Sequence, residues 1–518
     1  MSRIWSILFL GGWLVWSGGA AGPGAVIRID LGTIDRAVST VLNESDVLQK
    51  MAEEAAKKKA NAKPIKGISG LKVKDLCPPV ISLTLSPGSG LFMAVLIQMT
   101  ITGKSFIGGN MEMALAANLT TSSRLWQDAA GIPRLSCRNC HVALVSVKTN
   151  LPSSMLPKVM SKFLDSTLQK VLPGLLCPAV DAVLNLVNAK FTTLTSEIPL
   201  GSAGTLQYAL LNPPLTSETF IELDLKTVLH QKEGKEVDLP MDQPALASLP
   251  PKRDAATQLI LSANFLSAEL SVLQTSFNLD ISNNMVLGLP PLVTTMLGTL
   301  IPEISRVLPP SQPVVIEMRE AKAPVVTITP DKSFVQLFST AEFWVSPSET
   351  APESLFVLDV HSDLEAQFAI AEEKLRLSLT LQRMEKTLSV GSSPFLEGGW
   401  RSRGTSGARG RFAGGQDLGE ESAEGDGTGG LREVNDAVPF LSLQSASGGL
   451  GFSSLGTFDE LPLKGVLADI IHVAYVPSIN RVLRGGVPLP DLLGITYRWA
   501  NISGFENALV LDVPVTET

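Results

Sequence analysis

Two cysteines separated by two residues, Cys137 and Cys140, are the side chains whose spacing is most suggestive of chemistry. A thiol–disulfide oxidoreductase places the first cysteine of such a CxxC pair at a helix N-terminus, which stabilises the thiolate. The segment that follows, His141–Val147, alternates as a strand does, so we favour a structural bridge over redox chemistry. The pairing we prefer joins Cys140 to Cys177, which would hold a long helix on a sheet. Cys77 and Cys137 could form a second bridge if their strands are adjacent.

Other catalytic and metal-binding patterns are missing from the sequence. The four histidines are far apart, none belongs to an HExxH motif, and no GxSxG motif occurs. Gly103-Lys104-Ser105 imitates the end of a phosphate-binding loop, but Gln98 stands where the first glycine should be. No second cysteine pair completes a zinc site. The sequence therefore predicts no catalytic residues, no metal and no cofactor.

The first 21 residues have the form of a signal peptide. Arg3 is followed by an apolar run from Ile4 to Trp16 and then by small residues. The run is shorter than the roughly 20 residues that a transmembrane helix needs. We therefore expect residues 1–21 to be cleaved and the protein to be secreted or retained in the lumen of the endoplasmic reticulum or Golgi. Three sequons are predicted glycosylation sites: Asn43, Asn118 and Asn501.

Length and charge limit the other possibilities. The chain has 518 residues and a net charge of -8, which disfavours nucleic acid as a partner. Its size predicts two domains, which we place at residues 22–238 and 254–518, with a proline-rich linker at 239–253. Residues 391–436 are predicted to be a disordered insertion in the second domain, because Gly398–Gly430 holds twelve glycines and almost no aliphatic residues.

The hydrophobic periods predict one order of elements in both domains: helix, strands, helix, strands. In the first domain we expect a helix over 27–59, an antiparallel meander over 65–147 with both faces covered, a helix over 156–187 that kinks or breaks at Pro173, and strands near 205–211 and 219–225. In the second domain we expect helices near 263–277 and 290–308, strands across 314–383, a helix over 461–483 and terminal strands over 494–513.

Two features each allow two interpretations. Eight lysines between Gln49 and Asp75 give this segment a local charge of +5, which indicates either transient contact with an anionic membrane surface or a solvated helix end. The apolar helix stripes are either ordinary core or the walls of a tunnel for acyl chains. The candidate lipid-binding residues on these stripes are Ile34, Val38, Leu42, Phe163, Leu164, Leu168, Phe265, Leu467 and Ile471.

The chain resembles the BPI/LBP/PLUNC family of lipid-binding proteins. The resemblance covers nearly all of the chain after residue 21 except the glycine-rich insertion. The stretches that carry it are Pro64–Asp75, Thr102–Glu112, Val147–Pro152, Lys170–Pro178, Val487–Asp491 and Glu506–Leu511.

The resemblance implies an α+β fold: a boomerang of two similar barrel-and-helix domains, made of long twisted antiparallel strands and long helices and joined by a central sheet. It implies one apolar lipid pocket per domain and a single disulfide at Cys140 and Cys177. The turn Ser86–Gly90 carries no charge, unlike the basic tip of cationic relatives, so direct bactericidal action is not expected. We expect a non-catalytic lipid-binding or lipid-carrying protein, with phospholipid as the guest. The alternative is an interaction protein of innate defence or secretory trafficking that acts through its surface and has vestigial pockets.

Overall fold

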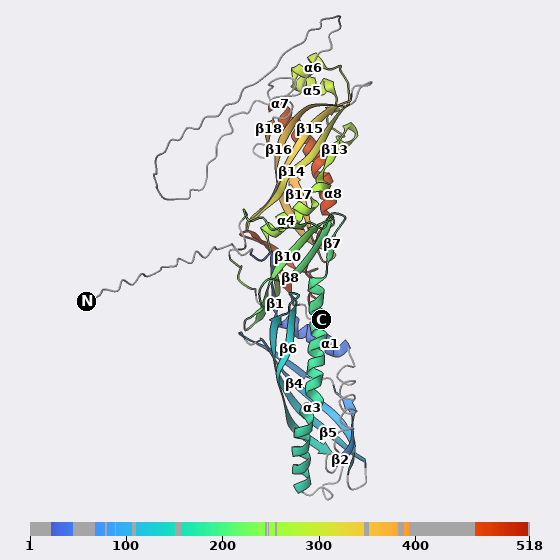
Figure 1. The fold of residues 1–518 in the computed structure, drawn as a ribbon, viewed down its shortest axis with the longest axis vertical. Helices are drawn as coiled ribbons and strands as arrows, with labels where there is room; N and C mark the ends of the chain where they lie inside the picture. The colour runs from blue at the N-terminus through green and yellow to red at the C-terminus, as the bar shows by residue number, and fades with distance from the viewer. Residues whose placement is uncertain are drawn as a thin grey trace, which may run out of the picture.

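The molecule is elongated, and three antiparallel sheets follow one another along its long axis (Figure 1). The computed structural model describes residues 22–44, 68–77, 80–88, 90–105, 110–150, 158–243, 246, 248–253, 256–346, 352–381, 388–392 and 461–515. The predicted signal peptide and most of the lysine-rich segment lie outside these residues. The two-domain α+β architecture predicted from the sequence is confirmed.

A five-stranded sheet forms one end of the molecule, as the predicted meander requires. Its strands are β2 (Ile68–Leu76), β3 (Val80–Ser86), β4 (Gly90–Ser105), β5 (Asn110–Gln127) and β6 (Pro133–Thr149), in the order β2-β4-β5-β6 with β3 on β4. Met93, Val95 and Ile97 face inward and are buried, whereas Phe92 and Leu96 face outward and are exposed. The expectation that both faces are covered is therefore wrong for the outward side chains of β4.

The first helix, α1 (Leu31–Glu44), begins four residues later than predicted. Residues Ala25–Asp30 form strand β1 instead. The prediction followed the helical spacing of Ile27, Leu31 and Ile34. Pairing with two other strands, β10 and β12, overrides that spacing and buries Ala25–Ile29 almost completely. The predicted continuation of the helix over 45–59 lies outside the described residues.

The long helix α3 (Lys158–Phe191) does not break at Pro173 and also runs through Pro178. A proline inside a helix loses one backbone hydrogen bond. Packing of α3 along β6 and the disulfide at Cys177 hold the helix in place against that loss. A short 3-10 helix, η2 (Thr192–Thr195), follows it. Figure 1 shows α3 lying along the five-stranded sheet.

The central sheet joins the two ends of the molecule. Its main order is β20 (Asn501–Phe505), β21 (Ala508–Pro514), β12 (Ala256–Ser262), β1, β10 (Phe220–Gln231), β8 (Gly204–Leu210) and β7 (Ile198–Leu200), with the short β9 (Leu215–Thr216) and β11 (Glu236–Val237) beside β10. β1 and β12 are antiparallel neighbours with Ile27 opposite Leu259. Each leads directly into a helix, so the helices of the two halves leave the sheet in opposite directions. The sequence did not predict β12.

The other end carries a seven-stranded sheet. Its strands are β13 (Leu279–Ile281), β14 (Val314–Ile328), β15 (Ser333–Val345), β16 (Glu353–Ala371), β17 (Lys374–Leu381), β18 (Leu388–Ser392) and β19 (Val487–Pro488). Two residues of the predicted insertion, Gly391 and Ser392, belong to β18; residues 393–436 lie outside the described part of the chain.

The helices of this second half match the predicted segments closely. They are α4 (Ala263–Leu273) with the 3-10 turns η3 (Gln274–Phe277) and η4 (Asn283–Met285), α5 (Thr294–Leu300), α6 (Pro302–Val307), α7 (Leu461–Ile470) and α8 (Val476–Leu483). A π-helical segment, η5 (Ile471–Tyr475), joins α7 to α8. Residues 290–308 thus hold two short helices rather than one.

Two helical stretches, Asp165–Thr195 and Pro462–Leu483, are long and apolar enough to cross a membrane by length and composition. Core helices meet the same criteria. About half of each 18-residue apolar window is buried inside the molecule. Packing against the sheets therefore accounts for the buried half of each window.

Candidate functional site

The predicted lipid-binding side chains lie in the apolar interiors between helices and sheets. Ile34 and Val38 on α1 and Leu168 on α3 are each about 2 % exposed, and Phe265 on α4, Leu467 on α7 and Ile471 in η5 are fully buried. The first three belong to the first half of the molecule and the last three to the second. The side chains of Leu42, Phe163 and Leu164 lie outside the described residues, although their backbones are in α1 and α3.

The inner face of the five-stranded sheet is rich in methionine, which the sequence analysis did not connect with a site. Met93 and Met99 on β4 and Met111 and Met113 on β5 are all buried among the core residues. Methionine is unbranched and adapts to irregular shapes. The two-residue spacing of Met111 and Met113 is the sequence signal that could have revealed this methionine-rich face. This surface can repack around a flexible hydrocarbon chain without a fixed complementary shape.

A cavity of about 590 Å³ opens where this half meets the central sheet. This volume is within the range of about 300–1,000 Å³ typical of small-molecule sites. Its lining combines apolar side chains of α1 and β3 with a polar rim: Asp30, Leu31, Gly32, Asp35, Ile81, Leu83, Glu218, Thr219 and Lys252. Of the nine predicted lipid-binding residues, the six whose side chains the structure describes do not line it. The rim carries three carboxylates and one ammonium group.

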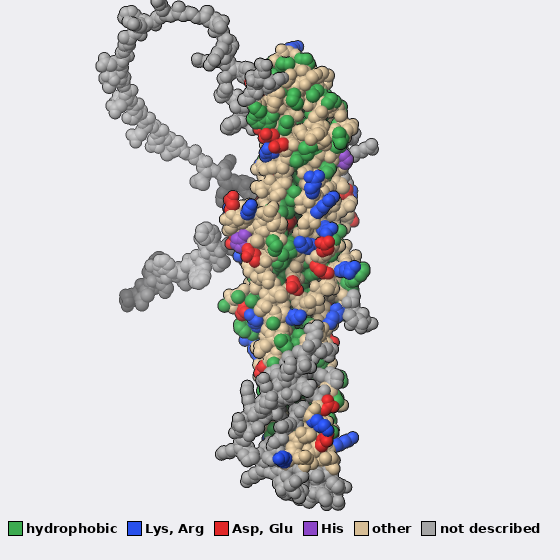
Figure 2. Space-filling model, turned by 90° about the vertical axis from the view of Figure 1, so that its right-hand side faces the viewer, with side chains coloured by type: hydrophobic (Ala, Val, Ile, Leu, Met, Phe, Trp, Pro, Cys, Tyr) green, Lys and Arg blue, Asp and Glu red, His purple; other side chains and the backbone are tan. Residues whose placement is uncertain are grey.

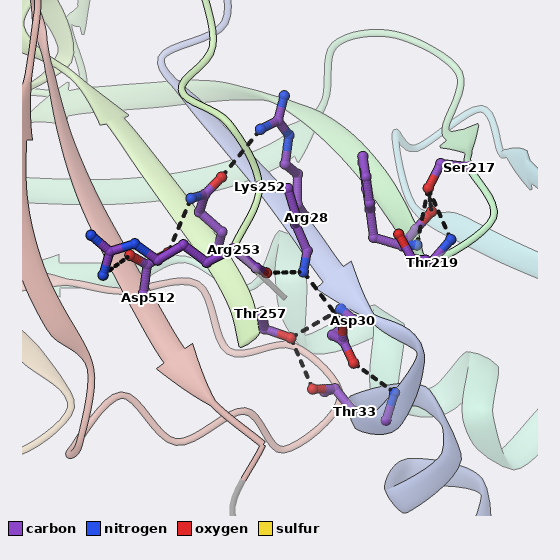
Figure 3. A network of polar contacts seen from close by, with 12 residues as sticks. Arg28, Asp30, Thr33, Ser217, Thr219, Lys252, Arg253, Thr257 and Asp512 are labelled. Atoms are coloured by element: carbon purple, nitrogen blue, oxygen red, sulfur yellow. Dashed lines mark hydrogen bonds and ion pairs between the residues drawn. The ribbon is translucent and has the colours of Figure 1, made fainter. Parts of the chain in front are cut away.

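Asp30 fixes the geometry of this cavity by ending β1 and capping α1. Its Oδ1 accepts a hydrogen bond from the Gly32 amide at 2.9 Å, the usual role of an aspartate at a helix N-terminus. Its Oδ2 is 3.2 Å from Lys252 Nζ. On the same rim, the carbonyl of Thr219 accepts a hydrogen bond from the Leu31 amide. The linker and the start of the first helix thus meet at Asp30 (Figure 3). The bond between Leu31 and Thr219 attaches the β9–β10 loop to the same helix start.

A buried polar network next to the cavity holds the linker on the central sheet (Figure 3). Arg28 pairs with Glu222 at 2.7 Å and donates to the carbonyl of Pro250 at 2.6 Å. Gln258 on β12 donates to Asp512 at 3.0 Å, and Arg253 of the linker lies 3.2 Å from the same carboxylate. A linker bonded in this way fixes the position of the cavity rim.

A second polar cluster lies inside the other half of the molecule. Glu320 Oε1 on β14 accepts hydrogen bonds from Ser339 Oγ on β15 and from Tyr475 OH in the π-helical segment, both at 2.5 Å. Burial raises the pKa of Glu320, although these hydrogen bonds oppose the rise. Glu320 Oε2 is buried without a hydrogen-bond partner in the structure. π-helical segments are frequent at functional sites.

Glu269 on α4 is a buried carboxyl group near the junction with the central sheet. Burial raises its pKa to about 8. Two buried tyrosines share this region: the hydroxyl groups of Tyr208 and Tyr497 donate to the carbonyls of Pro488 and Pro490. Burial raises the pKa of Tyr208, and the neighbouring Tyr497 and Glu269 raise it further. The sequence analysis singled out none of these three residues.

The predicted Cys140–Cys177 disulfide is present, with a Cα–Cα distance of 5.9 Å, and it joins β6 to α3. Cys77 and Cys137 are free thiols. The possible second bridge between them does not form, because it required adjacent strands. Cys77 follows β2 and Cys137 is on β6, at opposite edges of the five-stranded sheet. Two of the predicted glycosylation sites, Asn118 on β5 and Asn501 on β20, are exposed. The side chain of Asn43 lies outside the described residues.

The four histidines are on different elements: His141 on β6, His230 on β10, His361 on β16 and His472 in η5. Among the side chains that the structure describes, no group of three or more His, Cys, Asp or Glu residues is arranged to hold a metal ion.

Comparison with known proteins agrees with this architecture. Residues 33–187 match the N-terminal domain model of the LBP / BPI / CETP family, and residues 200–516 match its C-terminal domain model. BPI fold-containing family B member 6 of Homo sapiens is 40 % identical over 499 residues, covering 96 % of each chain. BPI fold-containing family B member 4 of Homo sapiens is 31 % identical, covering 86 % of this chain and 64 % of the relative.

A solved structure supports the fold independently of close sequence similarity. The crystal structure of lipopolysaccharide binding protein superposes with a TM-score of 0.53 at 17 % identity, covering 95 % of this chain and 99 % of that one. Two family models spanning most of the sequence, together with a relative that is 40 % identical along almost its whole length, show that the chain belongs to the LBP/BPI/CETP family, whose fold binds lipids.

Proposed function

We propose that this chain is a non-catalytic lipid carrier of the secretory pathway that holds the acyl chains of phospholipid in its apolar interiors. The observation that carries the proposal is the methionine-rich inner face of β4 and β5, which is buried in the same core as the apolar side chains of α1 and α3. The cavity at the central end of this half is the proposed route between solvent and that interior, because Leu83 lines the cavity and also belongs to the same core as the methionines. Each methylene group taken from water contributes about 0.8 kcal/mol, so hydrocarbon alone can supply most of the affinity.

The charge around the cavity supports a phospholipid rather than a strongly anionic glycolipid. Asp30, Asp35 and Glu218 surround one lysine, Lys252, which is already paired with Asp30. Multiple phosphate groups at this rim would be repelled by the carboxylates. Figure 2 shows basic and acidic side chains interspersed over the middle of one face of the molecule, without a large area of a single sign.

The proposal is tested by secreting the full chain from cultured cells, extracting the purified protein with organic solvent and identifying lipids by mass spectrometry. Uptake of a fluorescent phosphatidylcholine is then measured for the wild type and for Leu83→Trp, which places a bulky ring in the cavity. We expect at least fivefold lower uptake by this variant. Leu287→Trp is the matched control, because Leu287 is 82 % exposed in the other half. A wild-type protein that holds no lipid and takes none up would overturn the proposal.

A further inference from the structure

The outer face of the five-stranded sheet is uncharged over its middle. Strand segments 80–86, 91–102 and 113–123 contain no Asp, Glu, Lys or Arg. Several outward apolar side chains are well exposed there: Val80 by 68 %, Phe92 by 42 %, Leu96 by 36 % and Val145 by 61 %. Soluble monomers rarely leave a contiguous apolar surface of more than a few hundred Å² open to water. A covering group is therefore expected on this face.

Asn118 lies in the middle of this face. The strand register places Val80, Leu96, Asn118 and Ala143 in one row across β3, β4, β5 and β6. Phe92 is two rows further along β4, opposite Ser122. Asn118 is itself exposed. A group attached to its side chain would project from the centre of the apolar patch.

The alternation of β5 presents the sequon Asn118-Leu119-Thr120 in a suitable orientation. Leu119 points inward and is 1 % exposed, whereas Asn118 and Thr120 are on the outer face. Because the side chain of Asn118 takes no part in the backbone ladder, a substituent on it leaves the pairing with β4 and β6 intact. The modification is therefore compatible with the fold at a position in the middle of a sheet.

We propose that an N-linked glycan on Asn118 covers the apolar outer face of the five-stranded sheet. In the reaction, Asn118 Nδ2 loses a proton and forms a bond to C1 of the first sugar of a lipid-diphosphate-linked oligosaccharide. The bond between that carbon and the diphosphate oxygen breaks, and the diphosphate lipid leaves. The inference rests on the passage through the secretory pathway that the proposed function includes. A glycan is bulky and solubilising, so it replaces the missing second layer over the sheet.

The test uses the full chain secreted from glycosylating cells. Glycopeptide mass spectrometry is expected to find a glycan on Asn118 in the wild type and in Thr120→Ser, and none in Asn118→Gln or Thr120→Ala. The variants without the glycan should bind at least twice as much of the dye ANS and self-associate in size-exclusion chromatography. Asn501→Gln is the matched control, because it removes a different sequon and should leave dye binding unchanged.

Enzymatic deglycosylation of the folded wild type repeats the comparison without depending on how well a variant folds. An unmodified Asn118 in the secreted protein would overturn the inference. So would dye binding and a monomeric state that do not change when the Asn118 glycan is removed. A wild type that is already dimeric through this face would assign the face to a second copy of the chain. Lipid content separates the two proposals, because lipid without a glycan refutes only the inference, and a glycan without lipid refutes only the carrier function.

Discussion

Cys137 and Cys140 lie on the same face of β6 although they are three positions apart in the sequence. In a regular strand, positions i and i+3 point to opposite faces. Here Ser122 pairs with Asn139 and Ser123 pairs with Cys137, so Arg138 is an extra, bulged residue. The bulge turns both cysteines toward α3, where Cys140 is bonded to Cys177 and Cys137 lies within electrostatic reach of Asp181, one helical turn further along.

We predict that Cys137 is a slow-reacting thiol despite its place in a CxxC pair. Burial raises its pKa, and the Asp181 carboxylate raises it further, so little thiolate is present at neutral pH. In native protein at pH 7.5, iodoacetamide should alkylate the exposed Cys77 at least tenfold faster, as followed by mass spectrometry. Asp181→Asn should accelerate labelling of Cys137 alone, and Asp165→Asn, on the exposed side of the same helix, should not. Equal rates at Cys77 and Cys137 would contradict the prediction.

The bulge also shows why the sequence could indicate the Cys140–Cys177 disulfide but not the surroundings of Cys137. Alternating apolar residues predicted β4, β5 and β6, and helical spacing predicted α3. The extra residue at Arg138 has no distinct pattern in the sequence, because a bulge is decided by pairing with β5. The two strands β1 and β12 were missed for a related reason: both are buried on their two faces, polar side chains included, and each leads directly into a helix.

We predict that stability falls as pH rises because of Glu269. Its pKa is about 4.5 in the unfolded chain and about 8 in the folded one, so between these values the folded state binds more protons. The free energy of unfolding therefore decreases as pH rises from about 4.5 to 8 and levels off above 8. The amide in Glu269→Gln does not titrate in this range. The free energy of unfolding of the variant, relative to that of the wild type, should therefore rise by about 4 kcal/mol between pH 5 and pH 9.

Urea denaturation of both proteins over this pH range measures that difference. Glu233→Gln is the control, because Glu233 is exposed in the turn after β10 and should leave the pH profile unchanged. The nearby Tyr208 and Tyr497 ionise only at higher pH, since burial raises the pKa of both. A constant difference between Glu269→Gln and the wild type from pH 5 to 9 would show that the carboxyl group is not desolvated.

We predict that Arg28 keeps the linker closed over the central sheet. Arg28→Met leaves the Glu222 carboxylate, whose side chain is 16 % exposed, without its partner, and such a loss costs about 3–5 kcal/mol when a pair is buried. Trypsin cleavage after Lys252 and Arg253 should accelerate at least tenfold. The double variant Arg28→Met/Glu222→Leu should recover part of the stability, because no unpaired charge remains.

The control for Arg28 is Arg376→Met, which removes an exposed partner of Glu372 at 3.4 Å. An exposed pair of this kind contributes less than about 1 kcal/mol, so neither stability nor proteolysis should change. Arg28→Lys keeps the charge but loses the planar group that bonds Glu222, Pro250 and Gln258 together, and it should give an intermediate rate. Unchanged cleavage in Arg28→Met would mean that other contacts hold the linker.

The candidate site illustrates the limit of periodicity. A helix stripe such as Ile34 and Val38 is apolar whether it packs against the protein core or contacts a bound lipid. The structure shows both side chains buried. The cavity rim could not be predicted, because Asp30, Glu218 and Lys252 come from three distant segments. Only the pairing of β1 with β10 and the contact of the linker with the central sheet bring them together.

We predict that Tyr475 and Ser339 stabilise the fold cooperatively through Glu320. Both donate to the same oxygen, Oε1, while Oε2 is already buried without a partner. Tyr475→Phe or Ser339→Ala removes one donor, and each should cost about 1–3 kcal/mol of unfolding free energy. The double variant leaves the buried carboxyl group without either hydroxyl donor and should cost more than the sum of the two. Amide hydrogen exchange in Ile471–Tyr475 should accelerate in Tyr475→Phe, whereas Ser378→Ala, an exposed serine on β17, should change nothing. Additive costs in this double-mutant cycle would show that the two hydroxyl groups act independently.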